Sequence, residues 1–310
     1  MSQDLLASTL SSCIVAATPL VIAGLGELVV ERSGVLNLGI EGMMAVGAVV
    51  GFAFAHDSGS IWIGVAMAML AGTLLALAFG VATLSLMSDQ AATGLALTIF
   101  GLGLSAFIGK HYESMAVPPV GTIAIPLFDR IPILGRILFD QQSLVYASWG
   151  LFAVVQWFLA RSRWGLVVRA VGESPLAAHD VGYPVIAIRY AAVAFGGAMA
   201  GLAGAFLSEF YTPMWVEGMV AGRGWIAGAL VVFATWRPLR LMVGAYLFGF
   251  VMVAALFVQA SGARIAIPSQ WLNSLPYWAT IVVLVLISRN KHGIRLNSPA
   301  SLGSPFRVDE

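Results

Sequence analysis

IWIGVAMAMLAGTLLALAFGVATLSL, residues 61–86, is a continuous apolar stretch that contains no Asp, Glu, Lys or Arg. A transmembrane α-helix needs about 20 predominantly apolar residues to cross the hydrocarbon core of a bilayer. The stretch exceeds that length and therefore predicts a membrane-spanning helix. The whole chain has the same character, with 59% hydrophobic and 10% charged residues. Soluble domains carry about 25% charged residues, so the composition predicts a membrane protein.

The rest of the chain repeats this pattern. Seven further apolar runs of comparable kind occur at Leu5 to Val29, Val35 to Ala55, Ala91 to Gly109, Ser143 to Ala160, Tyr190 to Phe210, Leu239 to Ala260 and Leu275 to Ser288. A shorter run, Trp225 to Trp236, reaches only about 18 Å as a helix. It is a half-helix, a re-entrant segment, or part of a longer helix that begins near Val216. We expect an all-α, polytopic transmembrane bundle of about 8 to 10 spans with one short or re-entrant segment.

Basic residues predict the orientation of this single domain, residues 1–310. If every segment crosses, nine spans place the N-terminus outside, and both the loop 161–189 and the tail 289–310 in the cytoplasm. The cytoplasmic side then holds eleven cations: Arg32, Arg161, Arg163, Arg169, Arg189, Arg237, Arg240, Arg289, Lys291, Arg295 and Arg307. The outer side holds five: Lys110, Arg130, Arg136, Arg223 and Arg264. The excess of positive charge favours this polarity.

The inner loop contains a short helix with its own start and stop signals. Ser174 suits the N-cap, Pro175 the first helical position, and Gly182 the left-handed position after the end. Two turns of helix are unstable alone in water, so packing must hold this one. It is either an ordinary amphipathic connector or a coupling helix that seats in a groove of an ATPase.

Two polar residues open the second predicted span. In helical geometry Glu41 lies about 12 Å beyond Ser33, near the bilayer middle, and Asn37 lies four residues before it on the same face. A charged acid at that depth costs about 2.5–3.5 kcal/mol and needs a partner. Gly34, Gly39 and Gly42 permit close packing or a break in the helix. The pair is an interhelical hydrogen-bonded link, a lining of a solute pathway, or both.

Near the short run, Glu217 and Arg223 lie among aromatics and glycines. Aromatics there fit an interfacial belt, whereas the charges also suit a cavity mouth that meets a polar solute. Glycine and alanine at 196, 200 and 204, and at 197, 201 and 205, predict tight helix packing.

Other chemistries are disfavoured. The glycines before Lys110 lack Walker A spacing, no HExxH pattern occurs and the four histidines are scattered, so neither catalysis nor a metal site is indicated. The lone Cys13 excludes an intramolecular disulfide, and a net charge of +1 argues against nucleic acid as a partner.

An ordered set of motifs carries a resemblance to a known family. They are Glu31-Arg32-Ser33-Gly34-Val35-Leu36-Asn37-Leu38-Gly39-Ile40-Glu41-Gly42; Asp89-Gln90 with Gly94; Gly165 to Glu173 followed by Pro175, Ala177-Ala178 and Gly182; Gly201-Leu202-Ala203-Gly204; and Trp236-Arg237-Pro238. The set resembles the permeases of bacterial ABC importers for nucleosides and simple sugars, whose relatives serve ribose and branched-chain amino acids. It covers most of the chain and looks most like the shorter of two paired nucleoside permeases.

The resemblance implies an inner-membrane permease subunit, not an enzyme, that translocates a small polar solute. It implies ATPase-coupling residues at Gly172, Glu173, Ser174, Pro175, Ala177, Ala178 and Gly182. Pathway candidates are Asn37, Glu41, Gln90, Thr98, Glu217 and Arg223. Relatives often carry asparagine near Thr98, a departure that puts an ordinary nucleoside in doubt.

The same resemblance implies no cofactor in this chain, since a cytoplasmic ABC ATPase binds the ATP. Further expected partners are a second, different permease subunit, a periplasmic or lipid-anchored solute-binding protein, and membrane lipid. The alternative function is an ion-coupled secondary transporter, for which Glu41 and Glu217 are the candidate coupling acids. A membrane scaffold or enzyme is a third hypothesis, disfavoured by the absence of clustered catalytic groups.

Overall fold

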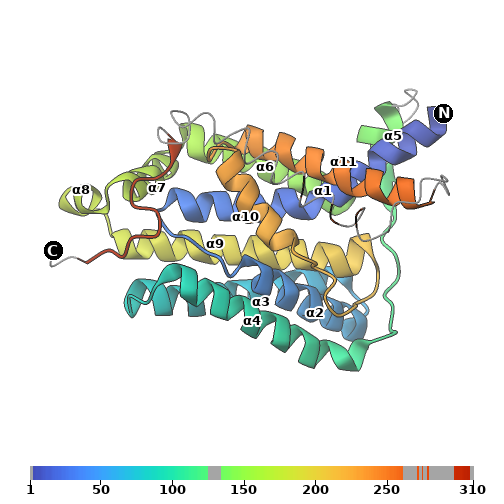
Figure 1. Ribbon diagram of the computed structural model, residues 1–310, viewed down its shortest axis with the longest axis horizontal. Coiled ribbons are helices and arrows are strands. Elements are labelled where there is room, and N and C mark those ends of the chain that lie inside the picture. The colour runs from blue at the N-terminus through green and yellow to red at the C-terminus, as the bar shows by residue number, and fades with distance from the viewer. Residues whose placement is uncertain are drawn as a thin grey trace.

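The structure is a computed structural model that describes residues 3–124, 134–260, 271, 274, 278 and 297–307. Its long helices lie side by side in an elongated bundle (Figure 1). Six helical stretches in the described ranges are long and apolar enough to cross a membrane: Ala7–Arg32, Ile40–Ser58, Ile61–Ser85, Gln90–Tyr112, Ser143–Arg161 and Val185–Tyr211. The fold is therefore the expected polytopic helical bundle.

These stretches are built on defined helices, some of which continue as short π- or 3₁₀-helices. The principal helices are α1 (Gln3–Arg32), α2 (Ile40–Ser58), α3 (Ile61–Gly80), α4 (Gln90–Gly109), α6 (Ser143–Arg161), α9 (Val185–Ala205) and α11 (Pro238–Ala260). The continuations are η1 (Val81–Ser85), η2 (Lys110–Tyr112) and η3 (Phe206–Tyr211). The predicted run Leu275 to Ser288 lies outside the described residues except for Trp278.

The short apolar run is a separate helix, α10 (Arg223–Phe233). Eleven residues reach only about 16 Å, half the hydrocarbon core. α10 is therefore a half-helix, one of the three predicted forms. It ends at a tight corner in which Thr235 and Trp236 have positive φ angles of 49° and 52°, and α11 follows directly.

The two ends of the bundle differ. The chain begins at one end, where α5 (Leu134–Leu138) and the short antiparallel strands β1 (Thr122–Ala124) and β2 (Asp140–Gln142) also lie. The opposite end carries α7 (Arg163–Glu173), α8 (Pro175–Asp180) and the C-terminal segment (Figure 1). These are called the α5 end and the α8 end below. The N-terminus and the C-terminal segment thus lie at opposite ends of the bundle, which agrees with an odd number of membrane crossings.

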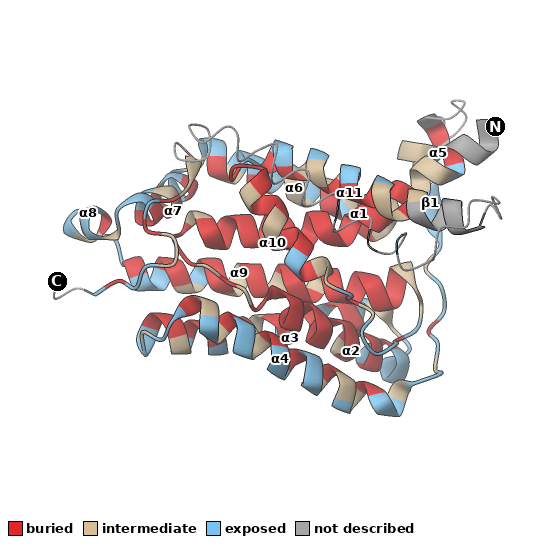
Figure 2. Ribbon diagram, in the orientation of Figure 1, coloured by how far each residue is buried: buried red, intermediate tan, exposed pale blue. Residues whose placement is uncertain are grey.

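Burial is uneven across the bundle (Figure 2). Nearly all of α1 is enclosed, and α9 packs against α1, α2 and α3. The predicted glycine and alanine tracks account for this packing: a side chain at Gly201 would collide with the Ala68 carbonyl of α3, and one at Gly204 with the Met44 carbonyl of α2. By contrast α4 exposes large apolar side chains such as Ile99 and Phe107.

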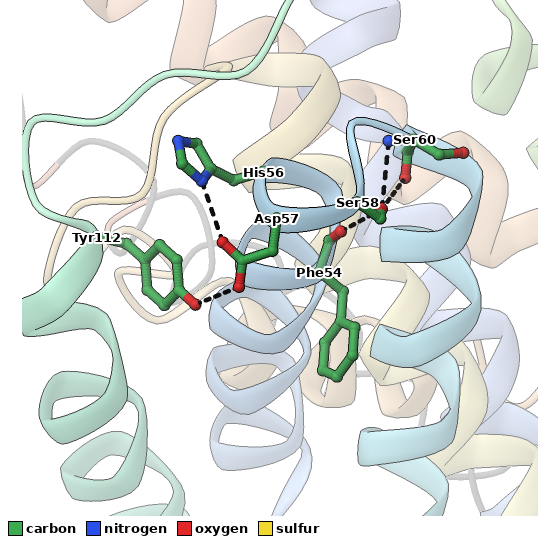
Figure 3. Close-up of polar contacts among 6 residues, drawn as sticks. All are labelled: Phe54, His56, Asp57, Ser58, Ser60 and Tyr112. Carbon is green, nitrogen blue, oxygen red and sulfur yellow. Dashed lines mark hydrogen bonds and ion pairs between the residues drawn. The ribbon is translucent and has the colours of Figure 1, made fainter.

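At the α5 end, polar contacts fasten α2 to η2, which follows α4 (Figure 3). The Tyr112 hydroxyl donates a 2.8 Å hydrogen bond to the Asp57 carboxylate, which His56 Nδ1 also contacts at 3.2 Å. The Ser58 hydroxyl turns back to the Phe54 carbonyl at 2.5 Å. The end of α2 nearest the α5 end is thus fixed.

Candidate functional site

The chain between α1 and α2 is not helical. Residues 33–39 form a turn and an extended stretch, and α2 begins only at Ile40. The expectation of a span from Val35, with Asn37 and Glu41 on one helix face, is therefore wrong; the glycine-permitted break is what occurs. Figure 1 shows α2 starting partway along the bundle, and Glu41 in its first turn is buried.

A break inside the membrane frees backbone groups that must find partners, because lipid offers none. Gln90 Oε1 accepts the Leu36 N–H at 2.8 Å, and the Thr98 hydroxyl donates to the Leu38 carbonyl at 3.0 Å. The Asn37 side chain accepts the Gly39 N–H at 2.9 Å and thereby opens α2. The structure thus brings together the predicted residues Asn37, Gln90 and Thr98, all of them buried.

Glu41 joins α2 to the half-helix α10. Its Oε1 accepts the Gly222 N–H at 2.7 Å and its Oε2 accepts the Gly224 N–H at 2.6 Å. These N–H groups open α10, where free donors and the helix dipole favour an anion. Gly224 must be glycine, because a Cβ there would lie 2.6 Å from Glu41 Cα. The Glu41 carboxyl group therefore lies between the N-termini of two helices, α2 and α10.

We call the set Asn37, Glu41, Gln90, Thr98, Gly222 and Gly224 the crossing. Among the predicted pathway residues, Glu217 and Arg223 lie beside it. Half-buried Arg223 donates to the carbonyls of Met219 (2.8 Å) and Val220 (3.2 Å) and lies over the Tyr211 ring, 5.8 Å from its centroid. Within the described chain it makes no ion pair with Glu217.

Exposed Glu217 lines a small cavity between α2, α4 and the loop before α10. The cavity measures about 20 Å³, and Ala45 and Ser105 contribute to its wall. One water needs roughly 10–15 Å³, whereas small-molecule sites measure about 300–1,000 Å³. This cavity has room for about one water and is too small for a solute.

A second polar cluster lies at the α8 end, around Arg189 at the start of α9. Its guanidinium is buried and donates to the Ser33 carbonyl (3.2 Å), the Ser304 carbonyl (3.2 Å) and the Ser301 hydroxyl (3.1 Å). The sequence counted Arg189 only as a basic loop residue. Its true role depends on the tail, which nothing in the local pattern of α9 reveals.

The tail, residues 297–307, ties this cluster to the end of α7. Ser301 donates to the Gly172 carbonyl through its N–H (3.0 Å) and its hydroxyl (2.7 Å), and the Gly303 N–H donates to the Gly34 carbonyl at 3.1 Å. A side chain at Gly172 would collide with the Arg32 carbonyl. We call residues 32–34, Gly172, Arg189 and the tail the tail junction.

Two motifs that the sequence gave separately meet beside the tail junction. Glu31, at the end of α1, accepts the Trp236 indole N–H at 2.5 Å, and Arg32 donates to the Trp236 carbonyl at 2.8 Å. Glu27, also on α1, contacts the Asn37 amide at 3.3 Å. Sequence reasoning missed these partnerships, although both motifs were already in the ordered set.

The predicted caps of α8 are confirmed. The Ser174 hydroxyl accepts the Ala177 N–H at 3.3 Å, Pro175 is the first residue, and Gly182 has a φ of +94°. Packing against the tail holds the helix: Ala178 belongs to an apolar cluster with Phe306, and the His179 ring lies 5.9 Å from the Phe306 ring.

The predicted coupling residues divide into two groups. Gly172 and Ala178 are buried and join α7 and α8 to the rest of the molecule, whereas Glu173, Ser174, Ala177 and Gly182 are exposed. Leu176, an apolar residue of the same helix, is 48% exposed. α8 therefore has an exposed face with an apolar residue, Leu176, at its centre, and this face is free to contact a partner protein.

Comparison with known proteins identifies the family of this chain. The profile of the branched-chain amino acid transport system / permease component matches residues 9–288. The chain belongs to this permease family. It is a multi-pass membrane permease, and the break, the half-helix α10 and the capped α8 are features of that permease.

Three relatives align over nearly the whole chain. The presumed glucose ABC transporter permease protein TsgC13 of Haloferax volcanii is 39% identical over 96% of this chain and 96% of its own. The nucleoside ABC transporter permease protein NupC of Lactococcus lactis is 32% identical over 89% and 90%. The guanosine ABC transporter permease protein NupQ of Bacillus subtilis is 31% identical over 98% and 97%.

Proposed function

We propose that this chain is the permease subunit of an ATP-binding-cassette importer for a small polar solute of the nucleoside or simple-sugar class. The observation that carries the proposal is the near full-length similarity to sugar and nucleoside ABC permeases, which fits a chain that presents a capped, tail-supported α8. A separate ATPase would bind the ATP, and this chain would need no cofactor of its own.

The proposed location is the bacterial inner membrane, with the α8 end in the cytoplasm and the domain 1–310 forming one transmembrane unit. The distribution of cations supports this orientation. Arg161 ends α6, Arg163 and Arg169 belong to α7, and Arg237 lies between α10 and α11. Positive charge concentrates on the cytoplasmic side of membrane proteins.

The proposed partners follow from the two ends. The exposed face of α8, with Leu176 at its centre, would seat in a groove of the cytoplasmic ATPase. The α5 end would receive a periplasmic or lipid-anchored solute-binding protein. A second, different permease subunit would complete the pathway, and an exposed apolar helix such as α4 supplies surface for it.

In this proposal the crossing is where access to the solute switches. Glu41 holds α10 to α2 through two N–H groups, and Thr98 and Gln90 hold the break to α4. Movement of α8 would reach the break through the tail junction, because Gly34 and Ser33 are bonded there. Separation of α2 from α10 would free the Glu41 carboxyl group and the α10 N–H groups to meet solute hydroxyls.

Uptake into liposomes tests the proposal against an ion-coupled transporter. The chain, purified with its co-expressed neighbours, is reconstituted with internal ATP, with the non-hydrolysable analogue, or with a proton or sodium gradient alone. We expect uptake of labelled guanosine or glucose only with ATP. Uptake driven by either gradient without ATP would overturn the importer and favour the secondary transporter.

A further inference from the structure

An apolar groove runs along the outside of the bundle near the α8 end. It lies between α6, α7 and α9, has a volume of about 580 Å³, and is lined entirely by apolar side chains. Along α9 it extends from Pro184 to Phe195, a rise of about 16 Å. That is the thickness of one leaflet of the hydrocarbon core, about 15 Å. The groove therefore has the length of an acyl chain.

The mouth of the groove has the chemistry of a membrane interface. Trp157 of α6 and Trp164 of α7 line it and are 59% and 66% exposed. Tryptophan concentrates where the hydrocarbon meets the headgroups. The exposed face of α7 thus marks the level of the headgroups on the molecule.

Two cations stand at the same corner. Arg161 ends α6 and Arg163 begins α7; both are exposed, and neither has a hydrogen bond or ion pair with another described residue. Arg161 follows Trp157 by four residues, so the two lie on one face of α6. A positively charged pair therefore adjoins the apolar groove.

We propose that the groove binds an anionic phospholipid of the cytoplasmic leaflet, with one acyl chain along α9 and the phosphate at Arg161 and Arg163. Basic pockets between helices on the cytoplasmic side bind lipid phosphates in this way, and guanidinium groups form strong, charge-assisted hydrogen bonds to phosphate. An apolar helix of a second subunit would instead bury both cations unpaired, which is costly.

The site has a consequence for α8. One wall of the groove is α7, whose Val168 lines it and also packs with Phe306 of the tail. α7 leads into α8 through Ser174 alone. A bound lipid therefore stabilises the wall that positions α8. This inference rests on the orientation proposed above and not on the importer assignment.

The test measures lipid binding to the purified full chain in neutral detergent. Phosphatidylglycerol and phosphatidylcholine with identical acyl chains are added in turn, and bound lipids are counted by native mass spectrometry. We expect the double variant Arg161→Gln/Arg163→Gln to lose phosphatidylglycerol affinity by about fivefold for each arginine, with phosphatidylcholine unaffected. The matched control, Arg237→Gln/Arg240→Gln, changes two exposed cations away from the groove and keeps the wild-type preference.

A second variant tests the acyl-chain part. Ala191 is exposed and lines the groove, so Ala191→Trp fills it and is expected to lower the binding of both lipids. Ala78→Trp, an equally exposed position on α3, leaves binding unchanged. All the altered residues are exposed, and thermal unfolding confirms that the variants fold.

Two results overturn the inference. One is an unchanged preference for phosphatidylglycerol in the double arginine variant, together with unchanged occupancy in Ala191→Trp. The other is efficient cross-linking of Trp157→Cys to a co-purified second permease subunit, which would make the groove a subunit interface.

Discussion

The crossing and the tail junction lie at the two ends of one non-helical segment, residues 33–39, and an acidic side chain stabilises the first while a basic side chain stabilises the second. At the crossing an acidic residue, Glu41, accepts hydrogen bonds from the N–H groups that open α10. At the tail junction a cation, Arg189, binds the Ser33 carbonyl just beyond the end of α1. An acidic residue thus meets the N–H groups at the start of α10, and a basic residue meets a carbonyl just after the end of α1. Both pairings are the ones that helix termini favour.

The difference between the two regions is in what they hold together. The crossing joins α2 to the half-helix α10 through the Glu41 carboxyl group, and the break to α4 through one hydrogen bond each with Gln90 and Thr98. The tail junction joins α1, α7, α9 and the tail through several bonds and a close backbone contact at Gly172. We infer that the crossing is the part that opens, whereas the tail junction is a rigid coupling between α8 and the break.

Gly172→Ala is the substitution that we expect to disrupt the tail junction most. Its Cβ would collide with the Arg32 carbonyl, and a backbone atom cannot move aside as a side chain does. Overpacking of this kind costs about 3 kcal/mol. The free energy of unfolding in detergent should fall by about that much. Gly150→Ala on α6 meets no atom within 4 Å and should leave it unchanged or slightly raised; equal effects of the two would contradict the rigid junction.

Glu41→Ala tests the part that opens. It removes two hydrogen bonds from N–H groups, each worth about 1.5 kcal/mol, and part of that free energy is recovered because water can then bind the N–H groups of α10. We expect a destabilisation of about 2 kcal/mol and a large loss of solute uptake. The control is Glu217→Ala, an exposed acid in the loop before α10, which should change neither. A Glu217 variant that matched Glu41→Ala would place the solute contact at the small cavity instead.

Thr98→Val separates the break from α4. It removes the hydroxyl that binds the Leu38 carbonyl and keeps the volume of the side chain, so about 1 kcal/mol of stability should be lost. Thr73→Val makes the same chemical change, but there the hydroxyl binds only a carbonyl of its own helix, that of Met69. Chemical denaturation gives the free energy of unfolding of both variants. If Thr98→Val left this free energy unchanged, the break would need no support from α4.

Ser174→Ala is the mildest change, because it alters only the cap of an exposed helix. Loss of an N-cap costs about 1 kcal/mol, confined here to α8. We expect normal stability of the chain but weaker binding of the ATPase in a pull-down assay. Ser12→Ala, which removes a hydroxyl bound within α1, serves as the control. Unimpaired ATPase binding would show that tail packing alone shapes α8.

Three kinds of sequence signal predicted parts of this molecule: the length of apolar runs, helix-capping residues, and a charged residue within an apolar run. Apolar length located the spans, and cap chemistry located α8, because Ser174, Pro175 and Gly182 act within a few residues of one another. Glu41 was recognised as a buried acid because charge at membrane depth is rare. In each case the information was local.

The predictions that failed were those that depended on contacts between residues far apart in the sequence. The segment around Asn37 is apolar enough to continue a helix, and only partners distant in sequence, Gln90, Thr98 and Arg189, make the break stable. Likewise nothing near Arg189 or Gly172 indicates that the tail covers them. Residues that bind backbone groups of another element carry no periodic signal, so their roles became visible only in the fold.

One measurement tests most directly whether the crossing handles the solute while α8 receives the energy. ATP hydrolysis and solute uptake are measured on the same proteoliposomes for Leu176→Asp, which puts a charge on the exposed face of α8, and for Glu41→Ala. We predict that Leu176→Asp loses uptake and permease-dependent hydrolysis together. Glu41→Ala keeps hydrolysis and loses at least about tenfold in uptake, a barrier change of about 1.4 kcal/mol. A wild-type ratio of uptake to hydrolysis in Glu41→Ala, or normal uptake in Leu176→Asp, would contradict this account.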